Sequence, residues 1–208
     1  MPATPPDRPQ IYLVTPAEFD SDAFADRLAR VLDATDIACL RLALASHSED
    51  RLIRAADALR GVAHARDVPL VIERHAGLVT RLGLDGVHLT DGPRSLRKAR
   101  AEIGADAILG AFCGASRHDG ITAGEAGADY IAFGPIGGPI GGPDPKAGED
   151  LFAWWSEMIE IPVVAEGGLT PALIETLAPV TDFFALGEEI WTAEDPAAAL
   201  RSLTAPLA

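Results

Sequence analysis

Cysteine is scarce in this chain of 208 residues, which holds Cys39 and Cys113 and no others. Both lie in apolar stretches typical of strand ends, so we expect reduced, packed thiols rather than a disulfide or a metal-binding pair. Structural disulfides are rare in reducing compartments. The low cysteine content therefore favours a cytoplasmic protein.

Positive charge is also in short supply. Lys and Arg number 17 against 31 Asp and Glu, which gives a formal net charge of −14. Nucleic-acid binding requires clustered positive charge that neutralises phosphates, so we expect no nucleic-acid partner. An anionic small-molecule ligand would need a local positive site on this acidic chain.

Long apolar runs are absent as well. Residues 1–9 (MPATPPDRP) lack the apolar core of a signal peptide, and no later stretch reaches the roughly 18 consecutive apolar residues that a membrane span needs. We expect residues 1–10 to form a disordered tail, and we expect no contact with a membrane. Hydrophobic residues still make up 48% of the chain, which is ample for one core, so residues 11–208 are expected to form a single domain.

Short β-rich runs alternate with longer segments at helical spacing, as is typical of strand–helix units around a parallel sheet. The eight expected strands are residues 11–14, 38–42, 70–72, 86–89, 107–110, 130–133, 162–165 and 182–186. Helices are expected at residues 22–32, 49–65, 95–103, 122–127, 151–159, 171–177 and 196–203. Eight such units close most simply into a (β/α)8 TIM barrel, an α/β fold whose working face is the rim of loops after the strands.

Local signals mark the helix starts. Pro171 and Pro196 suit the first turn of a helix, and Ser21 and Thr170 are expected N-caps. The third unit is the weakest, because residues 75–81 are short for a helix. A doubly wound open sheet is the alternative fold.

Two glycine-rich segments fall on the expected rim. Residues 134–145 (GPIGGPIGGPDP) cannot form a helix or an interior strand, because proline removes a donor and glycine adds backbone entropy. They form either a mobile lid or a plain connector. Gly167 and Gly168 directly follow the seventh expected strand, and they form either a tight turn or a loop that binds phosphate through backbone N–H groups.

Four segments carry a resemblance to a known family: residues 12–15 (YLVT), 85–89 (DGVHL), 127–136 (GADYIAFGPI) and 161–169 (IPVVAEGGL). In their order and spacing the chain resembles the thiamine phosphate synthase / TenI family over nearly its whole length. The resemblance implies a TIM barrel that serves thiamine biosynthesis. Its synthase branch is a transferase that joins a hydroxymethylpyrimidine diphosphate to a thiazole phosphate with the help of Mg2+, and its TenI branch tautomerises a thiazole phosphate.

The resemblance also implies where catalytic side chains belong, and most of them differ here. Of the family's Gln-x-Arg-x-Lys run only Arg41 is kept, and it either clamps an anion or forms an internal ion pair. The family's Asn-Asp pair, which binds metal, aligns with Glu73 and Arg74, and its second acidic ligand aligns with Pro93, with Asp91 nearby. An arginine opposes a cation, so we expect no metal site, and Mg2+ would be needed only if synthase activity were retained.

Two histidines are candidates for acid–base chemistry. The family's serine and histidine after the fifth strand align with Phe112 and Gly114, and His118 lies four residues beyond, where a surface role competes with an acid–base role. His88 matches a family position and is either an internal packed polar group or catalytic. The catalytic candidates are Arg41, Glu73, Arg74 and His88.

Ligand-binding candidates cluster at the loops after the sixth, seventh and eighth strands. The family's Thr-x-Thr-Lys run, which grips pyrophosphate, is replaced by PIGG at residues 139–142. Glu166, Glu188 and Glu189 lie near the family's thiazole phosphate site, where they would repel a dianion unless they face solvent or pair with arginines. The expected substrate-binding residues are Gly134, Pro135, Lys146, Glu166, Gly167, Gly168 and Glu188.

Three functions are open at this point. The first is an enzyme of thiamine biosynthesis, the second a divergent barrel that binds or converts a less anionic small molecule, and the third a non-catalytic regulatory or partner-binding relative. Three tryptophans are expected to cover the outside of the barrel or to fill seams between helices and strands, and a partner interface on that surface is the alternative: Trp154, Trp155 and Trp191. A homodimer is left open.

Overall fold

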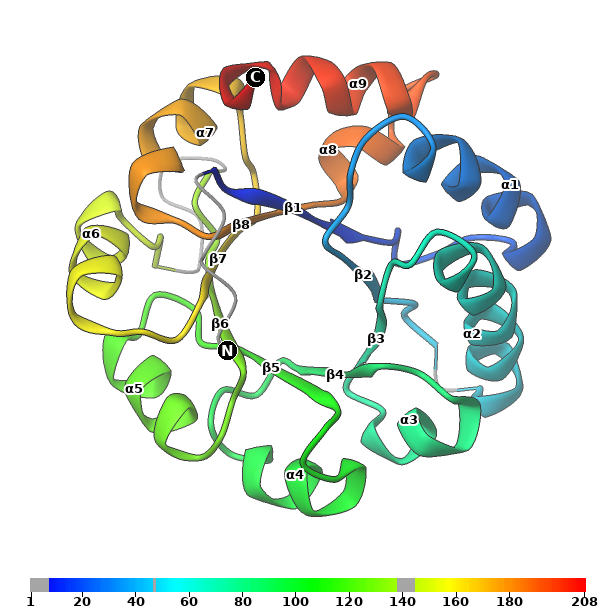
Figure 1. The fold of residues 1–208 in the computed structure, drawn as a ribbon, viewed down its shortest axis with the longest axis horizontal. Helices are drawn as coiled ribbons and strands as arrows, with labels where there is room; N and C mark the ends of the chain where they lie inside the picture. The colour runs from blue at the N-terminus through cyan, green and yellow to red at the C-terminus, as the bar shows by residue number, and fades with distance from the viewer. Residues whose placement is uncertain (1–7, 47, 138–144) are drawn as a thin grey trace.

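The computed structural model describes residues 8–46, 48–137 and 145–208 of the chain. Eight parallel strands close into a barrel, because β1 pairs with both β2 and β8 (Figure 1). The strands are β1 (Gln10–Val14), β2 (Cys39–Leu42), β3 (Leu70–Glu73), β4 (Gly86–Leu89), β5 (Ile108–Phe112), β6 (Tyr130–Phe133), β7 (Val163–Glu166) and β8 (Phe183–Leu186). The closure confirms the TIM barrel and excludes the open doubly wound sheet, which would leave two strands with a free edge.

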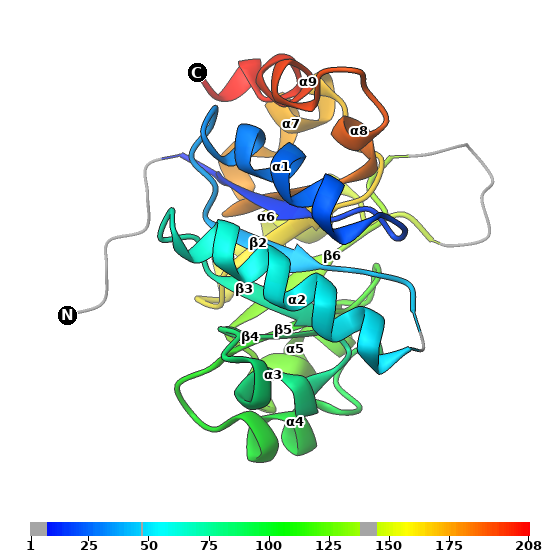
Figure 2. The same cartoon turned by 90° about the vertical axis from the view of Figure 1, so that its right-hand side faces the viewer.

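Helices surround the barrel and cover the outer face of the strands (Figures 1 and 2). They are α1 (Ser21–Leu32), α2 (Glu49–His64), α3 (Ala76–Leu82), α4 (Leu96–Ile103), α5 (Arg117–Glu125), α6 (Glu149–Met158), α7 (Pro171–Leu177), α8 (Glu188–Trp191) and α9 (Pro196–Leu203), with 3-10 turns η1 (Ala178–Val180) and η2 (Ala205–Leu207). Within the described ranges, no helix combines the length and apolar character needed to cross a bilayer.

Side chains along each strand alternate between two cores, as the strand period of two requires. Leu40 and Ile72 point outward and are fully buried against the helices. Their neighbours point inward and fill the barrel with a smaller cluster, Tyr12, Cys39, Val71, Tyr130, Ala132, Val164 and Ala185. The barrel centre is therefore a packed interior rather than a channel, and a ligand must bind at an end of it.

Helix starts follow the expected capping chemistry with one exception. Thr170 caps α7, and Pro171 and Pro196 occupy the first turns of α7 and α9 as predicted. The expected cap at Ser21 is wrong: Asp20 caps α1 by accepting a hydrogen bond of 3.0 Å from the backbone N–H three residues on. A carboxylate is favoured there because it also meets the positive end of the helix dipole.

Two helices differ clearly from expectation. α5 begins at Arg117 rather than at residue 122, and the four-residue α8 was not predicted at all. In α5, a Cβ on Gly120 would come within 2.8 Å of the Phe133 and Trp155 rings. Glycine thus lets α5 approach the barrel closely. Because the glycine stands where a helix facing the barrel would usually have an apolar residue, it also hides the apolar periodicity from which a helix is predicted.

The two irregular segments of interest are only partly described. β1 begins at Gln10, which was assigned to the expected tail, and residues 1–7 lie outside the described ranges. Residues 138–144, the middle of the expected lid, lie outside them too. The lid therefore stays a prediction.

Candidate active site

A pocket of about 360 Å3 opens where β1, β2, β3, β7 and β8 end. Its charged lining consists of Arg41, Arg74, Glu73, Glu166, Glu188 and Glu189. Four carboxylates therefore face two guanidinium groups, which leaves an excess of two formal negative charges. Seven of the eleven sequence candidates meet in this pocket, namely Arg41, Glu73, Arg74, Glu166, Gly167, Gly168 and Glu188.

Arg41 lines the pocket from β2 although only 3% of its surface is exposed. Its Nη1 and Nη2 donate to Oε2 and Oε1 of Glu166 at 3.1 and 2.6 Å, and its Nε lies 3.8 Å from Oε2 of Glu73. Burial is the largest single influence and lowers the pKa of the Arg41 guanidinium, but Glu166, Tyr12 and Tyr130 together raise that pKa by more, so that Arg41 stays charged. Of the two roles that the sequence left open, Arg41 has the internal ion pair.

Glu73 connects a second arginine to the same network. Its Oε1 accepts a hydrogen bond of 2.7 Å from Nη2 of Arg74, whose side chain is 58% exposed. The backbone of Arg74 has a φ of 67°, in the left-handed region that residues with side chains rarely adopt. Arg74 lines the pocket, and each of the two oxygens of the Glu73 carboxylate lies opposite an arginine.

Glu189 binds backbone rather than side chains. Its Oε1 accepts hydrogen bonds from the N–H groups of Gly168 and Leu169 at 3.0 and 3.3 Å, and its Oε2 accepts one from Gly187 at 2.9 Å. Glu188, by contrast, is exposed on the pocket lining. The sequence predicted that Glu189 would repel an anion, but its position in a backbone cradle could not be foreseen, because the cradle joins two loops.

His88 is buried inside the barrel and does not line the described pocket. Its Nδ1 lies 2.9 Å from the Tyr130 hydroxyl, which in turn lies 2.6 Å from the Tyr12 hydroxyl. Burial, and then the positive charge of Arg41, lowers the pKa of His88 well below its usual value, so the ring is neutral. The packing role is the one that this geometry supports.

The tyrosine pair was missed in the sequence, although a signal was present. The chain contains two tyrosines, Tyr12 and Tyr130, and both fall in expected strands. A buried tyrosine needs a partner for its hydroxyl, so two inward-facing tyrosines in one barrel predict a shared polar contact. Burial raises the pKa of both hydroxyls, and both are neutral at ordinary pH.

The candidates on the loop after β6 lie beside the pocket rather than in it. Gly134, Pro135 and Lys146 are absent from its described lining. The backbone N–H of Ile136 donates to the carbonyls of Glu166 and Gly167 at 3.1 and 3.0 Å. This part of the loop after β6 therefore holds the loop after β7 in position through backbone hydrogen bonds, without lining the pocket itself.

The residues present do not fit the Mg2+ ion that the family resemblance implies. Glu73 is already opposed by two arginines, Pro93 offers no side-chain oxygen, and Asp91 accepts a 2.6 Å hydrogen bond from Ser95 with its Oδ2. Mg2+ requires several oxygen ligands in a near-octahedral array. In the described ranges, no group of three or more His, Cys, Asp or Glu side chains is placed to hold a metal ion.

The remaining predictions concern residues outside the pocket. Cys39 and Cys113 are free and buried as expected, and burial raises the pKa of each thiol to about 12. His118 is exposed on α5. Trp155 and Trp191 are buried in seams between helices and strands, as predicted.

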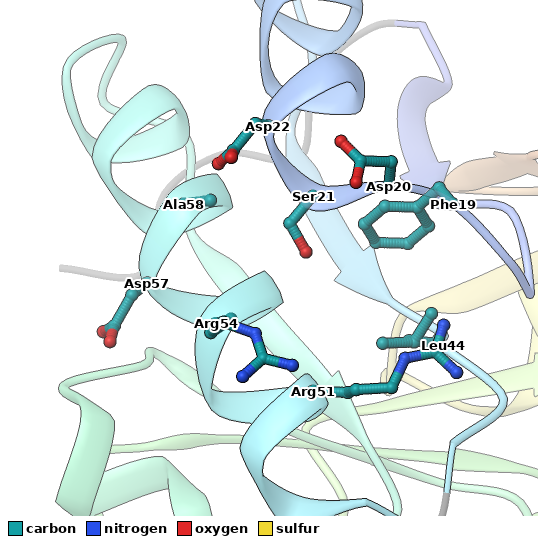
Figure 3. Close-up of a pocket in the computed structure, with 9 residues that line it drawn as sticks. All are labelled: Phe19, Asp20, Ser21, Asp22, Leu44, Arg51, Arg54, Asp57 and Ala58. Atoms are coloured by element: carbon teal, nitrogen blue, oxygen red, sulfur yellow. The ribbon is translucent and has the colours of Figure 1, made fainter.

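A second hollow, of about 470 Å3, lies between α1 and α2 on the outside of the barrel wall (Figure 3). Arg51 and Arg54 extend from α2 toward the start of α1, and Asp22 lies opposite them (Figure 3). No sequence candidate and no strand residue lines it, although Phe19, Asp20 and Leu44 belong to the loops after β1 and β2. Active sites of this fold are built at the strand ends themselves, and those ends line the first pocket. We therefore place the candidate site at the smaller rim pocket.

Comparisons with known proteins identify the family of the chain. The chain matches the family model described as thiamine monophosphate synthase over residues 11–189. A thiamine-phosphate synthase from Rhodospirillum centenum is 42% identical over 198 residues, covering 92% of this chain and 94% of that protein. One from Erythrobacter litoralis is 35% identical over 195 residues and covers 91% of each.

A solved structure is similar in fold. The thiamine phosphate pyrophosphorylase from Pyrococcus furiosus superposes with a TM-score of 0.80 at 20% identity, covering 95% of both chains. At this identity the likeness concerns the barrel alone. The family match and the two sequence relatives carry the assignment: the chain belongs to the thiamine phosphate synthase family of thiamine biosynthesis.

Proposed function

We propose that this chain serves thiamine metabolism in the cytoplasm by binding or converting, in its rim pocket, a small molecule that carries less negative charge than the diphosphate and phosphate substrates of the synthase. The observation that carries the proposal is the charge of the pocket, in which four carboxylates outnumber two arginines. A neutral or cationic ligand is compatible with this charge, and a dianion is opposed by it.

The ion pairs support the proposal because they engage the cations that an anion would need. Arg41 is held by both oxygens of Glu166 and lies close to Glu73. Two unit charges 4 Å apart interact by about 4 kcal/mol at an effective dielectric of 20. If a phosphate bound Arg41, the ion pair between Arg41 and Glu166 would be broken, and the phosphate would lie beside carboxylates that had lost their counter-ion.

A second candidate is synthase turnover itself, which the names of the two sequence relatives favour. It requires the chain to hold a diphosphate and Mg2+ without the family's lysines, threonines and metal-binding pair. A third candidate, a regulatory relative without turnover, is consistent with the same losses.

A turnover assay separates these candidates. Purified chain is incubated with the pyrimidine diphosphate, the thiazole phosphate and Mg2+, and the gene is tested in parallel for restoring growth without thiamine to a strain that lacks its synthase. We expect neither product nor growth, because the pocket lacks the groups that hold the diphosphate and the metal.

Product that disappears in the Arg41→Ala variant would overturn the proposal in favour of synthase activity. Conversion of another ligand that is lost in Arg41→Ala or Glu166→Ala would instead exclude the regulatory candidate and support the proposed function. The exposed residue His118 supplies the matched control, because His118→Gln lies outside the pocket.

A further inference from the structure

We propose that Glu189 is a specificity-determining residue that occupies, with its own carboxylate, the backbone cradle on which a phosphate group would otherwise rest, and so excludes phosphate esters from the rim pocket. The inference rests on the proposed function, whose ligand class it explains. According to this inference, one side chain accounts for most of the preference against phosphate. If pocket charge alone were responsible, each of the four carboxylates would contribute a similar share.

The contacts of Glu189 are those of a bound oxyanion. Three backbone N–H groups, of Gly168, Leu169 and Gly187, donate to its two oxygens at 3.0, 3.3 and 2.9 Å. They come from two different loops, after β7 and after β8, and they converge from both sides on one carboxylate. Converging backbone N–H groups of this kind bind anions through charge-assisted hydrogen bonds.

The carboxylate is fixed in this position by the packing of α8. Ile190 is fully buried, and the indole Nε1 of Trp191 donates to the backbone oxygen of Val14 at 2.7 Å. Arg27 donates to the backbone oxygen of Trp191 at 2.8 Å. Because α8 is held by contacts on both sides, its backbone places the Glu189 side chain within reach of the three N–H groups. An incoming phosphate would therefore have to displace this carboxylate.

Glu188 provides a matched comparison within the same pocket. It carries the same charge, lies one residue earlier on α8 and lines the same pocket, but its exposed side chain accepts no hydrogen bond within the described ranges. Removing Glu188 changes the pocket charge by one unit and leaves the cradle filled. Removing Glu189 changes the charge by the same unit and also frees three N–H donors.

The test is the binding of inorganic phosphate, measured by isothermal titration calorimetry on the full chain. The proteins are the wild type, Glu189→Ala, Glu189→Gln and Glu188→Ala, each checked by circular dichroism for an unchanged fold. We expect phosphate to bind Glu189→Ala at least tenfold more tightly than the wild type or Glu188→Ala. Glu189→Gln, which keeps one acceptor oxygen in the cradle, should lie between them.

Equal phosphate affinity in Glu188→Ala and Glu189→Ala would overturn the proposal, because charge alone would then account for the gain. Folded Glu189→Ala protein with no gain over the wild type would overturn it too. If Glu189→Ala does not fold, Glu189→Gln decides in the same way. None of these results depends on turnover, so synthase activity in the wild type would refute the proposed function separately.

Discussion

Arg41 contributes both a buried charge and the organisation of the site. It lies on β2 with 3% of its surface exposed, and its partner Glu166 is 125 residues away in sequence. The sequence could predict that each residue reaches the rim, because both follow from the strand pattern. It left open that Arg41 forms an ion pair and that Glu166 pairs with an arginine, but it could not predict that they pair with one another, because this depends on how strands β2 and β7 face one another across the barrel.

Replacing Arg41 with alanine should reduce the free energy of unfolding by about 3 kcal/mol, the lower end of the range for a broken buried ion pair, because it leaves the half-buried Glu166 carboxylate without its counter-ion while Glu73 keeps Arg74. Urea denaturation measures the change. The double variant Arg41→Met, Glu166→Leu should recover much of the loss, since both charges are then gone.

Arg66 is the matched control, because it forms a similar pair with Asp33 on the surface, with Nε 2.7 Å from Oδ1. Exposed pairs contribute little, so Arg66→Ala should cost much less than Arg41→Ala. Comparable losses in the two variants would contradict a special role for the buried pair.

His88 should make the fold less stable in mild acid. Its pKa is lowered in the folded state by burial and by Arg41, whereas in the unfolded chain it is near the ordinary value of about 6.5. Below that pH the unfolded state binds a proton that the folded state rejects, so the free energy of unfolding falls as pH falls. The limiting slope for one proton is about 1.4 kcal/mol per pH unit.

Urea denaturation from about pH 7 to about pH 5 measures this slope. The variant His88→Gln should lose part of it, and the exposed control His118→Gln should keep it. Tyr130, which contacts His88, and Tyr12, which contacts Tyr130, have raised pKa values and stay neutral over this range, and Arg41 stays charged. An identical slope in wild type and His88→Gln would exclude the histidine as the source.

At the scale of elements, the eight strands were predictable because each is a short apolar run between helical segments, and buried parallel strands have this pattern. The helices were predictable where apolar residues recur at helical spacing, as in α2, α7 and α9. α8 was not, because four residues after a glycine carry no periodicity, yet α8 is the element that delivers Glu189.

The contact between β5 and β6 should tolerate no side chain at Gly110. A Cβ there would lie 2.0 Å from Cζ of Tyr130, whose ring is buried. Gly110→Ala should therefore lower the free energy of unfolding by about 1–3 kcal/mol through overpacking. The shift in the urea midpoint measures it.

Gly61, in α2, is the control for that substitution, because a Cβ there would meet no atom within 4 Å. Gly61→Ala should raise the free energy of unfolding by about 0.5–1 kcal/mol, since alanine loses less backbone entropy in a helix. If both variants were stabilised, the close approach of Tyr130 to Gly110 would be refuted.

At the scale of the whole molecule, the charge of the pocket follows the charge of the chain. The chain has a formal net charge of −14, and its rim pocket has an excess of two carboxylates. Fold and family followed from sequence because they depend on strand order and backbone turns. The ligand class did not, because it depends on which charges pair in three dimensions and on which carboxylate fills the cradle.

The central claim is that this pocket prefers a ligand without a phosphate group, and one comparison tests it most directly. Isothermal titration calorimetry on the wild-type chain compares the thiazole alcohol with its phosphate ester, two molecules that differ by that group alone. We predict that the alcohol binds at least tenfold more tightly than the ester. Tighter binding of the phosphate ester would contradict the account.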